Sequence, residues 1–120
     1  PVELLSFGAV ALENQQVRVT WSTASEENNA YFTVERSLDG KTWSAIGIVP
    51  GVGNSNQIES YEFIDEKPIF GRQFYRITQT DLDGKSQTFR VVGVTLTAAA
   101  LEMNSYNVYP NPSSGQVKVF

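Results

Sequence analysis

The residues of this chain that could do chemistry are carboxylates, amides and hydroxyls, because the sequence contains neither histidine nor cysteine. Their absence removes thiolate chemistry, the usual zinc ligands and every triad that uses imidazole as base. Glu26 and Glu27 form an adjacent carboxylate pair, and paired carboxylates can in principle do acid–base work on a sugar. Adjacent acidic residues in a loop more often point apart and stay solvated. We therefore expect this pair to close a turn without catalysis.

Nucleophilic catalysis has equally little support in the sequence. A serine–lysine pairing is compatible with the composition, but no serine lies in a G-x-S-x-G motif. The sequence therefore predicts a protein that is not an enzyme and that needs no cofactor or metal.

The segment 50–57, PGVGNSNQ, is the most binding-like stretch of the chain. Its amide and hydroxyl side chains could hydrogen-bond a glycan beside an aromatic residue such as Tyr61, and loops on a rigid scaffold often carry binding sites. Glycine and asparagine also serve a crossover between two sheets, and that structural interpretation is favoured. The candidate ligand residues are Asn54, Ser55, Asn56 and Gln57.

The tetrapeptide LDGK occurs twice, at 38–41 and at 82–85. Asp81 and Asp83 could ligate calcium, but a calcium loop needs more converging oxygens than this segment offers. Asp-Gly is a strong hairpin signal because glycine adopts positive φ at little cost. Each copy also lies between two strand-like segments, so the pattern predicts two hairpin turns.

Composition limits the class of protein. With 120 residues, 41% hydrophobic content and 18% charged content, the chain is typical of one folded domain with a short appendage. No apolar run approaches the roughly 20 residues of a membrane helix. The net charge of −4, without clustered lysine and arginine, argues against nucleic acid as a partner. Because no leader pattern precedes Pro1, we expect a piece of a longer polypeptide.

Short alternating segments recur along the chain and predict seven strands. Val17, Val19 and Trp21 alternate with polar residues, which places Trp21 on a buried face, whereas Trp43 is left open between core and surface. Alternation breaks between Phe89 and Val92, which predicts a bulge. Seven antiparallel strands at this spacing are typical of an immunoglobulin or fibronectin type III-like β-sandwich. The expected strands are 2–12, 17–22, 31–37, 43–49, 60–65, 72–80 and 87–96.

A proline-rich turn near the end of the sequence breaks this pattern. Tyr109, Pro110, Asn111 and Pro112 cannot form a helix or a central strand, since each proline removes a backbone donor and restricts the residue before it. The segment 115–120 alternates again as a strand does. We therefore expect a β-sandwich over 1–97, a linker over 98–104 and the start of a further β unit over 105–120.

Several segments together resemble a known family. PVELLSF, VTWSTASEENNAYFTVERSLDGKTW, GVGNSN and FYRITQTDLDGK resemble the fibronectin type III-like domain that often precedes the C-terminal sorting domain of type IX secretion substrates in Gram-negative bacteria. SYNVYPNPSSGQVKVF resembles the start of that sorting domain, whose first strand typically carries YPNP. The two resemblances cover nearly the whole chain. In many fibronectin type III domains a corner tyrosine follows a glycine in this region, and Tyr75, four residues after Gly71, is expected to point inward.

The resemblance implies a function for each part. Such sandwich modules act as spacers beside upstream domains of the same polypeptide, while the sorting domain is recognised by the outer-membrane type IX export machinery. It therefore implies a protein that is secreted or attached to the cell surface, with Tyr109, Pro110, Asn111 and Pro112 in the export signal. The alternative is a carbohydrate-binding or adhesive β-sandwich module that binds glycans.

Overall fold

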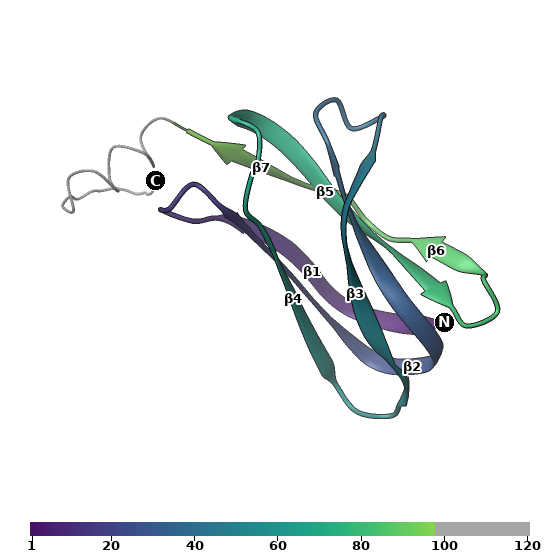
Figure 1. The fold of residues 1–120 in the computed structure, drawn as a ribbon. Helices are drawn as coiled ribbons and strands as arrows, with labels where there is room; N and C mark the ends of the chain where they lie inside the picture. Colours follow the sequence, from purple (N-terminus) through teal and green to yellow (C-terminus); the bar gives the residue numbers. More distant parts are fainter. Residues whose placement is uncertain (98–120) are drawn as a thin grey trace.

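The computed structural model describes residues 1–97, and all of its regular structure is β-strand. Seven strands pair antiparallel into one curled sheet, as Figure 1 shows. The strands are β1 (Val2–Ala11), β2 (Val17–Ser37), β3 (Ser44–Ser55), β4 (Glu59–Asp65), β5 (Gly71–Asp81), β6 (Ser86–Thr88) and β7 (Val92–Leu96). The predicted all-β antiparallel class is confirmed.

Strand β2 organises the sheet because its two halves pair with different neighbours. Residues 17–26 pair with β1, and residues 17–23 also pair with β4. Residues 29–37 pair with β3 and β5. Between the halves the register shifts, and Asn28 has a φ of 53°. Two strands and a loop were predicted here, whereas the structure has one bent strand.

The last predicted strand, 87–96, is divided instead. β6 pairs with the end of β5 and β7 pairs with its beginning, and residues 89–91 lie between them outside the ladder. The Phe89 N–H still donates to the Ile77 carbonyl at 3.0 Å. The interruption falls where the alternation of the sequence breaks, but it is a gap between two strands, so the predicted bulge within one strand is wrong. The total of seven strands agrees because two predicted strands are merged into β2 and one predicted strand is divided into β6 and β7.

The core fills the concave side of the curled sheet. Along β2 the side chains of Val17, Val19 and Trp21 are buried and those of Arg18 and Thr20 are exposed, which confirms the predicted alternation. The rings of Trp21, Phe32 and Tyr61 pack with centroids 4.8–5.7 Å apart. The main cluster of buried residues is Phe7, Val17, Val19, Trp21, Phe32, Val34, Tyr75, Ile77 and Val94.

Both LDGK segments form hairpin turns, as predicted. Gly40 has a φ of 74° and joins β2 to β3, and Gly84 has a φ of 93° and joins β5 to β6. In the first turn Asp39 accepts hydrogen bonds from the backbone N–H groups of Lys41 (2.8 Å) and Thr42 (2.7 Å). Asp39 therefore holds the first turn by accepting hydrogen bonds from nearby backbone N–H groups.

Gly47 provides a stability prediction. A Cβ at this position of β3 would lie 2.2 Å from the Phe63 ring of β4, so the glycine allows Phe63 to cover the strand. We expect Gly47→Ala to lower the free energy of unfolding by about 1–3 kcal/mol through overpacking. Gly8→Ala is the matched control because nothing lies within 4 Å of its added Cβ, and it should be neutral or slightly stabilising. Equal urea midpoints for the two variants would contradict this assignment.

Candidate functional site

Glu26 lies at the bend of β2 and is the centre of a buried polar cluster. Its side chain is buried, with 4% exposed, so the prediction that it stays solvated in a turn is wrong. Asn29 is also buried. The carboxylate accepts four hydrogen bonds: from Thr23 Oγ1 (2.9 Å), Asn29 Nδ2 (2.8 Å), Tyr61 OH (2.5 Å) and the Val52 N–H (3.3 Å).

The cluster extends from Glu26 to the neighbouring strand. Asn29 Oδ1 accepts a hydrogen bond from Gln79 Nε2 at 2.9 Å, and the same nitrogen lies 2.7 Å from Asp81 Oδ1. Gly51 makes this arrangement feasible, because a Cβ there would lie 2.3 Å from Asn29 Nδ2. Strands β2, β3, β4 and β5 each contribute to one continuous network.

The network decides the charge of Glu26. Burial alone would raise the pKa of its carboxyl, but the hydrogen bonds from Tyr61, Asn29, Thr23 and the Val52 N–H outweigh burial and hold that pKa below its ordinary 4.5. Burial, followed by the bond to the Glu26 carboxylate, raises the pKa of the Tyr61 hydroxyl far above 10.0. At neutral pH an ionised carboxylate therefore accepts bonds from a neutral phenol.

The lowered pKa of Glu26 predicts that the stability of the fold depends on pH. Because the folded pKa of Glu26 is depressed, its contribution to stability is complete above pH 4.5 and is lost as pH falls through the folded pKa. The free energy of unfolding of wild type should therefore exceed that of Glu26→Gln by about 1–3 kcal/mol at pH 6–7, and this difference should shrink below about pH 4.5. Urea unfolding of both proteins from pH 7 to pH 3 measures it. A difference in free energy of unfolding that stays constant or grows on acidification would contradict the role of the Glu26 charge.

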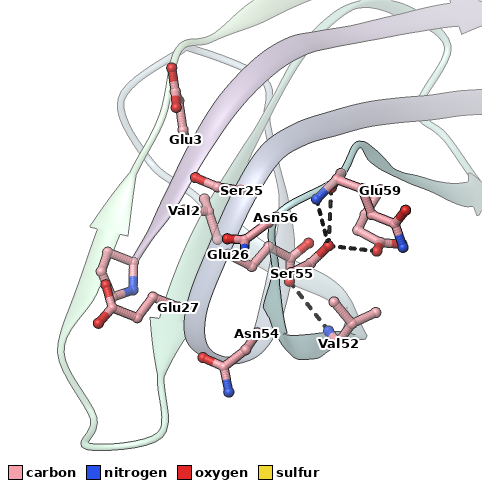
Figure 2. Close-up of a pocket in the computed structure, with 12 residues that line it drawn as sticks. Val2, Glu3, Ser25, Glu26, Glu27, Val52, Asn54, Ser55, Asn56 and Glu59 are labelled. Carbon is pink, nitrogen blue, oxygen red and sulfur yellow. Dashed lines mark hydrogen bonds between the residues drawn. The ribbon is translucent and has the colours of Figure 1, made fainter.

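The predicted ligand residues lie beside this cluster, partly in a strand. β3 continues to Ser55, which pairs with Glu26, so the expectation of a crossover loop over 50–57 is wrong for residues 50–55. Figure 2 shows Asn54, Ser55 and Asn56 along a groove of about 900 Å³. Its other lining residues are Pro1, Val2, Glu3, Ser25, Glu26, Glu27, Val52, Gln57 and Glu59.

Several polar side chains of this groove, those of Glu26, Asn54, Ser55 and Glu59, are bonded within the protein. Asn54 Oδ1 accepts from the Asn28 N–H at 3.0 Å. The Ser55 hydroxyl lies 2.8 Å from Glu59 Oε2, as Figure 2 shows, and it donates to the Gln57 carbonyl at 3.0 Å. The structure thus brings Asn54, Ser55, Asn56 and Gln57 together, and the side chains of Asn54 and Ser55 support the end of β3.

The described lining of the groove offers no aromatic side chain on which a sugar could stack. None of its twelve described lining residues is aromatic. Tyr61, the expected platform, stacks on Trp21 with centroids 5.7 Å apart and directs its hydroxyl to Glu26. Glu27 is exposed while Glu26 is buried, so the two carboxylates do not form a working pair.

A second polar cluster, missed by the sequence analysis, lies toward the opposite end of the sheet. Tyr75 is completely buried, as predicted, and its hydroxyl donates to Asp65 Oδ2 at 2.7 Å. Arg36 Nη1 lies 2.6 Å from the same oxygen. Tyr75 therefore bonds a carboxylate, and burial together with that bond raises the pKa of its hydroxyl well above 10.0. The alternation of the sequence places Tyr75 inward, but it does not indicate that Asp65, ten residues earlier, is its hydrogen-bond partner.

Trp43, which the sequence left open, lies half-buried outside the core. The Arg76 guanidinium stands 4.2 Å from its ring centroid, and Arg76 Nε lies 2.6 Å from Glu35 Oε1. The ring is thus covered by a paired cation.

The predicted export motif, Tyr109, Pro110, Asn111 and Pro112, lies outside the described residues, as do the linker 98–104 and the segment 105–120. Among residues 1–97 there is no helix long and apolar enough to cross a membrane.

Comparison with known proteins gives a likeness of fold. No family model matches the chain, and no curated protein matches it. A β-1,2-glucanase from Parabacteroides distasonis contains a similar structure, with a TM-score of 0.55 and 17% sequence identity. The match covers 80% of this chain but 12% of the glucanase chain. At this identity the likeness concerns the fold alone.

Proposed function

We propose that residues 1–97 are a non-catalytic spacer module of a secreted or cell-surface bacterial protein, followed by the signal for type IX secretion. One observation carries the spacer role: the carboxylate best placed for chemistry, Glu26, is bonded to four donors of its own fold. A general base needs a lone pair directed at a substrate, and Glu26 directs its oxygens into the protein.

We further propose that the curled sheet is a β-sandwich of the fibronectin type III kind. The pairing of β2 supports this, because β1 and β4 accompany its first half while β3 and β5 accompany its second half. Two such groups of strands facing one core are the arrangement of this class. The buried Tyr75 is the counterpart of its corner tyrosine.

A spacer role also agrees with the shape of the module. In Figure 1 the N-terminus and the end of β7 lie at opposite ends of the sheet, and the longest extent of the Cα trace is 49 Å. The glucanase contains a similar fold over 12% of its chain, and we propose that this chain is likewise one part of a larger polypeptide with upstream domains. Its C-terminal region would engage the outer-membrane export machinery.

Secretion of a reporter tests the export role. The parent's sequence from Pro1 onward is fused behind a reporter in a strain with intact type IX export. Deletion from Asn107 onward should abolish release of the reporter, whereas replacing residues 1–97 by an unrelated β domain of similar length should preserve it. Release that continues unchanged without the region from Asn107 would refute the export role.

The carbohydrate-binding alternative keeps one supporting observation, the groove beside Asn54 and Asn56. It would require a glycan held by amides alone, since Tyr61 is occupied in the core. We therefore rank it below the spacer.

A further inference from the structure

Three apolar residues of β3 form a short exposed row. Ile48 and Val52 are 64% and 50% exposed, and Pro50 between them is exposed as well. Tyr31 of β2 pairs with Pro50 and widens the apolar surface on that side. Exposed apolar side chains that gather in one place are typical of interaction surfaces. We name Ile48, Pro50 and Val52 the β3 row.

The residues that alternate with the β3 row face the core. Val49 packs against the core cluster. A Cβ on Gly47 would meet the ring of Phe63, and a Cβ on Gly51 would meet the side chain of Asn29. Because successive residues of a strand point to opposite faces of the sheet, the β3 row points away from the core. The row is therefore not needed to fill the domain.

The surroundings of the β3 row carry no charge along the chain. The 17 residues of segment 42–58 contain no charged side chain, although 18% of the whole chain is charged. Other exposed apolar residues have charged neighbours: Leu82, for example, lies between Asp81 and Asp83. The β3 row thus combines exposure with a long uncharged segment.

Strand β3 is also an edge strand, but one that is poorly suited to extending the sheet. Among residues 1–97 it pairs with β2 alone. Pro50 has no backbone N–H, and the register with β2 shifts on both sides of it. Proline and register irregularities protect an edge from pairing with another strand. A partner would therefore contact the side chains of the β3 row and would not add a strand to the ladder.

We propose that the β3 row is the contact surface of a homodimer, in which two copies of the chain pack about a two-fold axis at Pro50. Ile48 and Val52 stand two residues before and two residues after Pro50, so an antiparallel arrangement places Ile48 of each copy against Val52 of the other. A two-fold axis brings like groups together, and a charge near it would meet its own copy. A different partner could neutralise such a charge, so the uncharged segment favours a second copy.

The net charge of −4 makes the dimer dependent on salt. Two copies repel each other at long range, and salt screens this repulsion, so association should strengthen as salt is added. A contact of a few side chains is small, and we expect a dissociation constant of about 10 μM to 1 mM. The dimer requires neither export nor a glycan, so its absence would leave the spacer role intact.

Sedimentation equilibrium of the 120-residue chain at low and high salt tests the proposal. Wild type should dimerise reversibly, and more tightly at high salt. Ile48→Lys places an unpaired charge in the contact and should weaken the dimer about tenfold or more. Leu82→Lys is the matched control, because it adds the same charge at a residue that is 70% exposed and lies outside the β3 row. Circular dichroism establishes that both variants are folded.

A single introduced cysteine locates the contact, since the chain has none of its own. Pro50→Cys lies on the proposed axis and should form an intermolecular disulfide under mild oxidation much faster than Leu82→Cys. Adding Ile48→Lys to Pro50→Cys should remove this advantage. The proposal is overturned by a wild-type chain that stays monomeric up to about 1 mM at high salt. It is equally overturned by a dimer that Ile48→Lys leaves unchanged, or by equal rates of disulfide formation at the two positions.

Discussion

Trp21→Ala is expected to leave the domain unfolded or barely folded. The indole is 1% exposed, stacks on Tyr61 and meets Phe32 edge-on at 5.4 Å between centroids. Truncating such a side chain typically costs about 3–5 kcal/mol, because contacts are lost and a cavity remains. A domain of this size is held by about 5–15 kcal/mol. Urea unfolding followed by circular dichroism measures the loss.

Arg18→Ala is the control for Trp21→Ala on the same strand. Arg18 points to solvent and pairs with Glu62 at 2.8 Å, and the two side chains are 48% and 55% exposed. Such a surface pair contributes about 0–1 kcal/mol. If Arg18→Ala were the more damaging change, the register of β2 and the position of the core would both be wrong.

Glu26→Ala should be strongly destabilising, although the sequence alone suggests that Glu26 is a solvated turn residue. It removes the acceptor of four donors, of which Thr23 and Asn29 are themselves buried. A buried donor without a partner costs about 1–3 kcal/mol, so two of them predict a loss of about 2–6 kcal/mol. Urea unfolding at pH 7 measures the free energy directly.

The adjacent Glu27 provides the matched control for Glu26→Ala. Its side chain is exposed, and Glu27→Ala should change the free energy of unfolding by about 0.5 kcal/mol or less. Equal effects of the two substitutions would mean that Glu26 is not buried in solution. Glu26→Gln should recover only part of the stability that Glu26→Ala loses, since an amide cannot accept from all four donors.

The sequence was sufficient for the pattern of the fold. Alternation placed Val17, Val19, Trp21 and Tyr75 correctly, because half-buried strands carry the period in their own residues. The two LDGK hairpins followed from glycine at positive φ. Boundaries were less predictable: glycine and asparagine suggested a crossover loop over 50–57, yet β3 continues to Ser55 and pairs there with β2.

The polar clusters could not be predicted, because their partners are distant in sequence. Glu26 and Glu27 look alike in the sequence, but a register shift against β1 between Thr23 and Ser25 changes the phase of β2, and Glu26 is buried while Glu27 is exposed. Tyr61 reaches Glu26 across 35 positions, and Arg36 reaches Asp65 across 29. A signal was present in Thr23, which continues the buried phase of Trp21 and so places a polar side chain in the core. Such a residue requires a partner.

The central claim is that the groove beside Glu26 belongs to the fold and is not a ligand site, and a glycan array with the folded chain tests it most directly. The array would compare wild type with a variant carrying Asn54→Ala and Asn56→Ala, after urea unfolding shows that the variant is folded. The spacer role predicts no selective signal from either protein. A selective signal from wild type that the double substitution removes would contradict it and establish a carbohydrate-binding module instead.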